Sequence, residues 1–235
     1  MTHPLTIDGN PKTIKGNAQG ITTGILHLWP NKTICPHATA CMGLCIKQTG
    51  RAGIIKKGEK TNVIIEARKR KTKAFMDDPT AFISSIIKGI GALERKAERQ
   101  GTKPAVRLNG TSDIPWEILM DMQTFQGVQF YDYTKSAKRA IQWAKGRMPA
   151  NYHLTFSRSE INEEECLEVL AAGGNVAVVF DTAKKDALPT TWHGRKVIDG
   201  DKTDLRFLDP RGVVVGLKAK GRNAKKDTSG FVVKT

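Results

Sequence analysis

The chain has 235 residues, 39% of them hydrophobic, and a formal net charge of +15 at pH 7. This length can bury one sizeable core, which predicts a single α/β domain over residues 1–235. No signal peptide opens the chain and no apolar run approaches membrane-spanning length, which argues against a membrane protein and favours a reducing cytoplasm. The excess of Lys and Arg favours a polyanionic partner such as nucleic acid, with a solubilising surface as the alternative.

The first hundred residues contain one predicted strand and two predicted helices. Residues 1–20 are polar and rich in Gly and Asn, which predicts an irregular N-terminal arm. Ile21–Trp29 alternates as a β-strand, and Asn62–Met76 and Pro79–Gln100 have the apolar spacing of helices. The second helix is expected to direct six side chains inward: Phe82, Ile83, Ile86, Ile87, Ile90 and Leu93.

After residue 100, short apolar runs alternate with helical stretches, which is typical of βαβ units and a parallel sheet. The predicted strands are Ala105–Leu108, Val128–Tyr133, Tyr152–Phe156, Val176–Phe180 and Val213–Leu217. The predicted helices are Pro115–Phe125, Ser136–Lys145 and Asn162–Ala172. A basic, partly mobile tail is expected over residues 222–235.

Three cysteines lie close together in the loop after the first predicted strand: Cys35, Cys41 and Cys45. A disulfide framework is disfavoured because the chain has only four cysteines. Structural zinc usually shows two paired cysteine motifs, and the second pair is missing here. The spacing therefore favours a [4Fe–4S] cluster over zinc, with inert buried thiols as the third interpretation. Cys166 lies in the apolar pattern of a predicted helix, so we expect a core residue there.

Polar sequences follow the predicted strands, and in parallel α/β folds the carboxyl ends of strands form ligand sites. Tyr133–Ser136 and Phe156–Ser159 each contain an aromatic residue, a hydroxyl, a base and a serine. The serines fit helix capping as well as ligand contact, and the bases fit an exposed surface as the alternative. The expected ligand-binding residues are Arg107, Asn109, Asp113, Tyr133, Lys135, Ser157 and Arg158.

The segment Asp204–Pro210 is rich in charge and lies before the last predicted strand. Its aspartates do not have the spacing of an EF-hand calcium loop. We therefore expect turns there, with Asp204 or Asp209 pairing Arg206 or another base. Two denser basic runs, Arg68–Lys71 and Lys218–Lys226, are the candidate contacts for nucleic acid.

Several motifs occur along the chain in a fixed order: the cysteine loop with Gly50-Arg51, then Arg107–Asp113, Phe130–Ser136, Asp204–Pro210 and Gly216–Gly221. Together they resemble a family of bacteriophage proteins named after a mycobacteriophage gene product, the "gene product 88" family. The resemblance extends from about Gly24 to Gly221. It implies a phage origin and a location in the host cytoplasm, and it brings no established activity.

The chain is more distantly similar to radical S-adenosylmethionine enzymes. These hold a [4Fe–4S] cluster with three cysteines that follow the first strand of a partial (β/α)6 barrel. Their usual spacing is Cys-x3-Cys-x2-Cys, whereas this chain has Cys-x5-Cys-x3-Cys. The similarity implies a partial (β/α)6 barrel-like parallel sheet, a cysteine-rich cluster loop, and a fourth iron open to a small molecule such as S-adenosylmethionine.

The expected function is that of an iron–sulfur enzyme of radical S-adenosylmethionine type. Its substrate would be a nucleotide, a nucleic acid or a small molecule. One alternative is an iron–sulfur binding protein without catalysis. The other is a zinc-stabilised nucleic-acid-binding module.

Overall fold

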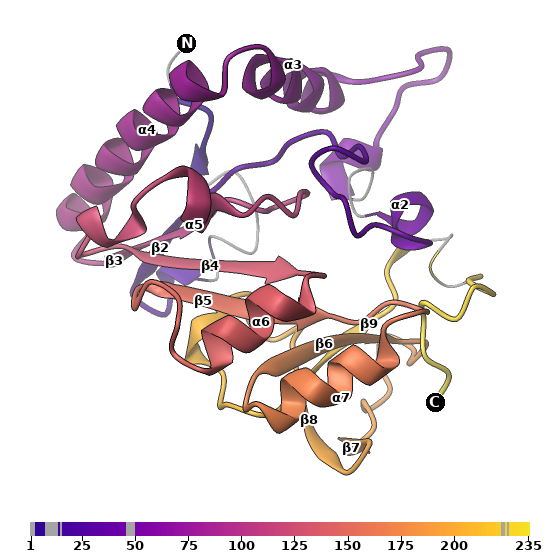
Figure 1. The fold of residues 1–235 in the computed structure, drawn as a ribbon. Coiled ribbons are helices and arrows are strands. Elements are labelled where there is room, and N and C mark those ends of the chain that lie inside the picture. The colour runs from indigo at the N-terminus through magenta and orange to yellow at the C-terminus, as the bar shows by residue number, and fades with distance from the viewer. Residues whose placement is uncertain (1–2, 8–13, 15, 46–49, 222–223, 225) are drawn as a thin grey trace. The chain divides into compact units, whose positions relative to one another are not determined.

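The computed structural model describes residues 3–7, 14, 16–45, 50–221, 224 and 226–235 (Figure 1). The chain divides into two compact units. The first unit consists of Met1–Pro36 and Cys45–Tyr131, and the second of His37–Leu44 and Asp132–Thr235. Parts of the predicted N-terminal arm and of the predicted basic tail lie outside the described residues.

Among the described residues, nine strands follow the order β1-β2-β3-β4-β5-β6-β9-β8-β7. Their bounds are β1 Thr6–Ile7, β2 Ile21–Ile25, β3 Lys103–Arg107, β4 Gln129–Thr134, β5 Tyr152–Ser157, β6 Asn175–Phe180, β7 Thr191–Trp192, β8 Arg195–Asp199 and β9 Val214–Lys218. The pairs β2–β3, β3–β4, β5–β6, β6–β9 and β8–β9 are parallel. The pairs β1–β2 and β7–β8 are antiparallel.

The predicted α/β class and the mostly parallel sheet are confirmed. Each of the predicted strands overlaps an observed strand, because runs of β-branched and aromatic residues mark buried strands well. The strand order runs from β1 to β7 without returning to its start, so closure into a barrel is not shown. Three observed strands were not predicted from the sequence: β1, β7 and β8.

Two long helices, α3 (Val63–Asp77) and α4 (Pro79–Gln100), belong to the first unit. Asn62 caps α3 by accepting hydrogen bonds from the amides of Ile64 and Ile65. Asp78 ends α3 and caps α4 by accepting from Ala81 N, while Pro79 occupies the first turn. Local capping chemistry therefore sets the boundary that the sequence predicted.

Helix α4 contacts β2 and β3 through one apolar stripe. Phe82, Ile86, Ile90 and Leu93 of this stripe are buried, as predicted. Ile87 was predicted to face inward, but 44% of it is exposed. One residue beyond Ile86 is a rotation of about 100° around the helix, which directs Ile87 away from the strands.

The predicted helix Pro115–Phe125 is broken into α5 (Trp116–Leu119) and the 3-10 turn η3 (Met122–Thr124). Met120 between them has an extended backbone with φ −148° and ψ 143°. The side chains of Trp116 and Met122 are fully buried, so packing of two apolar side chains favours the break over a continuous helix. Two further short elements precede α3: α2 (Cys41–Leu44) and the 3-10 turn η2 (Gly50–Gly53).

In the second unit, α6 (Ala137–Ala144) and α7 (Glu163–Ala171) lie side by side over β5 and β6 (Figure 1). Ser136 caps α6 by accepting a hydrogen bond from Arg139 N, in agreement with the capping interpretation. The first turn of α7 carries Glu163, Glu164 and Glu165, whose charges are favourable near a helix N-terminus. No described helix is long and apolar enough to cross a membrane.

A buried charged cluster lies beside β5, next to the 3-10 turn η4 (Arg206–Leu208). Arg206 is fully buried, and its Nη1 lies 3.3 Å from Asp209 Oδ2, which confirms the predicted pairing with one of the two aspartates. Burial raises the pKa of Asp209, although the charge of Arg206 opposes this effect. Burial lowers the pKa of His153 in the same cluster to about 3, and the charges of Arg206 and Arg211 add to the effect.

We expect His153 to make the protein sensitive to acid. In the folded chain His153 stays neutral until the pH approaches 3, whereas in the unfolded chain it binds a proton below its ordinary pKa of 6.5. The free energy of unfolding should therefore fall with decreasing pH, by on the order of 2 kcal/mol between about pH 7 and about pH 4.5. Urea unfolding of the wild type and of His153→Gln at both pH values measures this loss.

The variant His153→Gln should show a smaller acid-induced loss than the wild type, because glutamine binds no proton in this range. The matched control is His37→Gln, since His37 is exposed and should leave the loss unchanged. Equal losses in the wild type and in His153→Gln would contradict the role of His153.

Candidate metal and ligand site at the cysteine loop

The segment after β2 is tied to the segment after β3 within the first unit. Leu26 N donates to Arg107 O at 2.9 Å, and Gly110 N donates to Leu26 O at 3.0 Å. Thr111 Oγ1 donates to Leu28 O at 2.6 Å. A Cβ atom at position 110 would lie 2.6 Å from Leu26 O, so only glycine permits this approach of the two segments.

Cys35 is held at the carboxyl ends of β2 and β3 by these contacts. Its thiol lies 3.8 Å from Thr111 O, in the geometry of a weak S–H hydrogen bond. The preceding residue, Ile34, accepts a hydrogen bond from Asp113 N at 2.8 Å. Asn31 closes the turn before Cys35, because its carbonyl oxygen accepts from Cys35 N at 2.9 Å. The first cysteine of the loop therefore lies where the sequence predicts ligand chemistry.

Asn109, one of the predicted ligand-binding residues, is buried and uses its side-chain amide inside the loop. Its Oδ1 accepts hydrogen bonds from Ser112 Oγ, Ile114 N and Trp116 Nε1 at 2.8, 2.9 and 3.1 Å. Its Nδ2 donates to Ile114 O at 2.9 Å. Buried polar groups need such partners, so this side chain determines the shape of the loop that carries Thr111 and Asp113.

Cys45 lies near Arg68 of α3 in the first unit. Arg68 is half-buried, and burial lowers its pKa, while the charge of a Cys45 thiolate raises it. A guanidinium beside a cysteine stabilises the thiolate, which is the form that binds metals. Arg68 was expected to contact nucleic acid, and no local pattern connects it with Cys45, since 23 positions separate them.

The middle of the cysteine loop belongs to the second unit, where Glu160 holds it. Glu160 Oε1 accepts a hydrogen bond from Ala40 N, the residue before Cys41, at 2.9 Å. Burial raises the pKa of Glu160, but the hydrogen bond from Ala40 and the charge of Lys135 outweigh this effect, and the pKa is lowered. Sequence reasoning missed Glu160, because nothing local links it to a loop 120 positions away.

The structure brings Lys135, Ser157 and Arg158 together in the second unit. Lys135 Nζ donates to Ser157 O and Ser157 Oγ, both at 3.2 Å, and to Arg158 O at 3.0 Å. Arg158 is buried and forms an ion pair with Glu163 at 3.1 Å. The two basic side chains at the strand ends, Lys135 and Arg158, thus lie close together, and both form hydrogen bonds or ion pairs within the protein.

The remaining predicted ligand residues occupy the strand ends of their own units. Arg107 is the last residue of β3 and is half-buried. Asp113, also half-buried, follows it in the first unit through the loop shaped by Asn109. Tyr133 lies in β4 within the second unit and is half-buried. Their assignment as ligand contacts stays a prediction.

Cys166 differs from the three loop cysteines. It is fully buried in a core cluster with Phe156, Val169 and Val176. Burial raises the pKa of its thiol to about 12, so it stays protonated at neutral pH. Cys35, Cys41 and Cys45 are each half-buried, and none of the four cysteines is in a disulfide. The loop thiols are therefore the ones that solvent and metal can reach.

The described residues were searched for a group of side chains that could hold a metal ion. Within the described parts of the chain, no three His, Cys, Asp or Glu side chains form a group that could hold a metal ion. Cys35 and Cys45 belong to the first unit, and Cys41 belongs to the second. The donor chemistry of three accessible thiols suits an iron–sulfur cluster.

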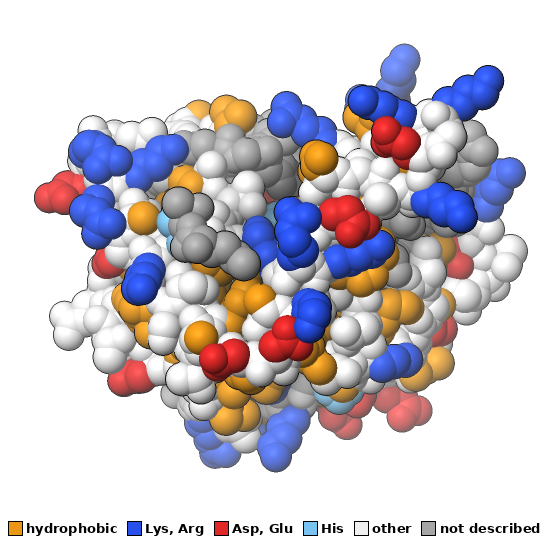
Figure 2. Space-filling model, turned by 90° about the horizontal axis from the view of Figure 1, so that it is seen from above, with side chains coloured by type: hydrophobic (Ala, Val, Ile, Leu, Met, Phe, Trp, Pro, Cys, Tyr) orange, Lys and Arg blue, Asp and Glu red, His pale blue; other side chains and the backbone are white. Residues whose placement is uncertain are grey.

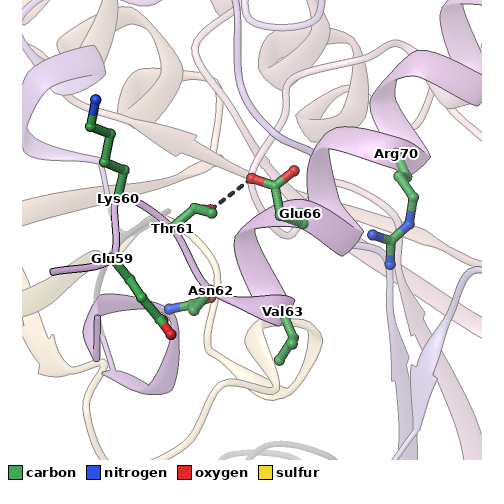
Figure 3. A pocket seen from close by; sticks show the side chains of 7 residues that line it. All are labelled: Glu59, Lys60, Thr61, Asn62, Val63, Glu66 and Arg70. Atoms are coloured by element: carbon green, nitrogen blue, oxygen red, sulfur yellow. Dashed lines mark hydrogen bonds between the residues drawn. The ribbon is translucent and has the colours of Figure 1, made fainter. Parts of the chain in front are cut away.

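A surface pocket of about 490 Å³ lies at the start of α3 in the first unit (Figure 3). It is lined by Glu59, Lys60, Thr61, Asn62, Val63, Glu66 and Arg70. Thr61 Oγ1 donates to Glu66 Oε1 at 2.7 Å, and hydrogen bonds from Thr61 and Lys69 lower the pKa of Glu66. The pocket contains none of the predicted ligand residues, and its capping residue Asn62 has a structural role in α3.

These elements define an α/β protein with a mostly parallel sheet and a loop of three accessible cysteines after β2. A protein-family model described as Gene product 88 matches residues 4–235, and the chain therefore belongs to the Gene product 88 family. This match confirms the resemblance to a family of phage gene products, and it does not show the similarity to radical S-adenosylmethionine enzymes. A search of curated proteins and a search of solved structures found no match.

We expect Asn109→Ala to destabilise the protein by about 3 kcal/mol, because it removes the acceptor of three hydrogen bonds and leaves buried donors unpaired. Equilibrium unfolding in urea measures this loss. The matched comparison is Ser112→Ala, which removes only one of the three contacts and should cost about 1 kcal/mol. Equal, small losses in both variants would show that Asn109 does not hold the loop.

Proposed function

We propose that this protein binds a [4Fe–4S] cluster through Cys35, Cys41 and Cys45. The observation that carries the proposal is the contrast between these three accessible thiols on one loop and the fourth, buried cysteine. Three thiolates can each take one iron of a cubane cluster and leave the fourth iron open. Cys166 is unsuited to the fourth position, because it is protonated and packed in the core.

The contacts of the loop support this proposal in two ways. Thr111 O orients the Cys35 thiol in the first unit, and Glu160 fixes the residue before Cys41 in the second. Arg68 offers positive charge beside Cys45. Metal binding is commonly coupled to the folding of the segment that supplies the ligands.

The proposed ligand of the open iron is a small molecule such as S-adenosylmethionine. With the ligand bound at the open iron, a reduced cluster would supply one electron to it and would itself be oxidised by one electron. The side chains proposed to bind and orient the ligand are Arg107, Asn109, Asp113, Tyr133, Lys135, Ser157 and Arg158. The proposed role is that of an enzyme acting on a nucleotide, a nucleic acid or a small molecule in the host cytoplasm, with a partial (β/α)6 barrel as its architecture.

Single replacements of the loop cysteines test the cluster. Anaerobically purified Cys35→Ala, Cys41→Ala and Cys45→Ala should each lose bound iron and sulfide, because each thiolate holds one iron. Cys166→Ala should retain both, since that thiol lies in the core. Iron and sulfide analysis measures the outcome. The broad absorption that we expect at about 400 nm for a cubane cluster gives a second measurement.

Two results would contradict the proposal. One is stoichiometric zinc without sulfide in the anaerobic wild type, which would favour the zinc-stabilised alternative. The other is retention of the full cluster in all three loop variants. A cluster that is present but gives no change in its EPR signal with S-adenosylmethionine would favour the alternative of a non-catalytic iron–sulfur protein.

The net charge of +15 favours nucleic acid as a second candidate partner. Lys and Arg side chains are spread over the face seen in Figure 2, with fewer Asp and Glu among them. Several basic side chains of each predicted run, however, form hydrogen bonds or ion pairs within the protein. Lys71 Nζ donates to Pro4 O at 2.6 Å, Lys69 pairs with Glu66, and Lys218 Nζ donates to the carbonyl oxygens of Lys184 and Asp186.

We expect any binding to single-stranded or duplex DNA to weaken steeply with salt through release of counterions. Arg70 is exposed and lies in the basic run Arg68–Lys71, so Arg70→Glu, which reverses its charge, should weaken binding. Fluorescence anisotropy with a labelled oligonucleotide across a salt series measures this effect. Absence of binding at low salt would leave the charge as a solubilising surface.

A further inference from the structure

Residues 227–235, called here the C-terminal strap, form a folded segment in the second unit. Asp227 closes its first turn: Oδ1 accepts from Ser229 N and Ser229 Oγ, and Oδ2 accepts from Val232 N at 2.9 Å. Val232 is buried and packs with Ala219 and Ala224. These contacts join the strap to the rest of the second unit, and the expectation of a partly mobile tail stays a prediction.

The strap continues along the carboxyl end of β6. Val233 N donates to Val179 O at 2.8 Å, and Asp181 N donates to Val233 O at 3.0 Å. Asp181 Oδ1 accepts from Thr235 N and Thr235 Oγ1 at 2.9 and 2.8 Å. Lys234 Nζ lies 3.6 Å from Asp181 Oδ2. Asp181 is therefore the main side-chain anchor at the end of the strap.

The strap also contacts Arg158 and Lys135, the two basic side chains that were expected to bind a ligand. Arg158 Nη1 donates to Gly230 O at 2.6 Å and to Phe231 O at 3.1 Å. Lys135 Nζ lies 5.2 Å from the centroid of the Phe231 ring. The strap thus contacts the carboxyl end of β5 as well as that of β6, and its backbone carbonyls take the place that oxygen atoms of a ligand would take.

The strap is weakly held compared with the core beneath it. Only Asp227 and Val232 within it are buried, and Phe231 and Val233 are half-buried against the core, so less apolar area opposes its opening than opposes the loss of a core strand. The acceptors that it offers to Arg158 are neutral carbonyls, and an anionic oxygen makes a stronger hydrogen bond with a guanidinium. Arg158 Nε is buried and has no hydrogen-bond partner within the described residues, so this donor is still available to a ligand.

We propose that the strap is a displaceable cover and that its release opens a phosphate-binding site at Arg158 and Lys135. Glu163 binds Arg158 Nη2 at 3.1 Å and keeps the guanidinium in position after the strap leaves. Lys135 contributes the second positive charge, and its contacts with Ser157 and Arg158 keep it at the same strand end. The inference rests on the proposed function and deepens it, because it assigns the phosphate of the proposed nucleotide or nucleic-acid substrate, rather than S-adenosylmethionine, to these strand ends.

The variant Asp181→Ala tests the strap, because it removes the anchor of Thr235 without altering Arg158 or Lys135. If strap opening limits binding, the affinity of Asp181→Ala for inorganic phosphate should be about fivefold higher than that of the wild type, because the strap is open in a larger fraction of the molecules. The matched control is Asp77→Ala, which removes an exposed ion pair with Lys73 in the first unit and should leave the affinity unchanged. Isothermal titration calorimetry measures all three proteins.

Hydrogen exchange at the amides of Val232 and Val233 reports on the opening itself, because both amides are hydrogen-bonded in the closed strap. Phosphate should accelerate their exchange in the wild type. Arg158→Lys, which keeps the charge and loses the fork of donors, should weaken phosphate binding at least tenfold. Parallel titrations with a nucleoside triphosphate and a single-stranded oligonucleotide identify which source of phosphate binds best.

The proposal is overturned if Asp181→Ala binds phosphate no more tightly than Asp77→Ala, or if exchange of the strap amides is the same with and without phosphate. Iron and sulfide are measured in the same samples. A protein that lacks the cluster but shows the strap response would contradict the proposed function alone. A protein that holds the cluster and shows no strap response would contradict this inference alone.

Discussion

The side-chain amide of Asn109 is the contact on which the cysteine end of the first unit depends. It satisfies three donors and one acceptor of the segment that follows β3. This fixes the loop in which Gly110 approaches Leu26 O and Thr111 O accepts the Cys35 thiol. Because a buried amide must have its partners, a network without any formal charge places the first cysteine.

In the second unit, charged side chains rather than a neutral amide hold the segments at the strand ends. Lys135, Arg158 and Glu160 lie at strand ends, where α/β proteins commonly bind ligands, and each of them binds protein backbone. Their burial is tolerable because their charges are compensated locally, as in the pair of Arg158 with Glu163. A ligand at this end of the unit would therefore compete with the chain itself, including residues 227–235, whose carbonyl oxygens accept from Arg158.

Patterns along the chain predicted the regular elements well where local physics decides them. Capping by Asn62 and Asp78 and the apolar stripe of α4 give helix bounds within a residue or two of those observed. The helix predicted over Pro115–Phe125 was wrong, because burial of Trp116 and Met122 favours an extended Met120 between them. Barrel closure could not be predicted either, since it depends on the pairing of edge strands such as β1 and β7 rather than on any one βα unit.

The sequence by itself determined the α/β class, the family motifs and the presence of three clustered cysteines, because periodicity, capping and side-chain chemistry act over a few neighbouring residues. Only the tertiary structure decided which of these cysteines goes with which unit, that Glu160 holds the residue before Cys41, and that Arg158 binds the backbone of Gly230. The last contact joins residues 72 positions apart. Such contacts follow from how the strands and the strap pack, and no local pattern in the chain encodes them.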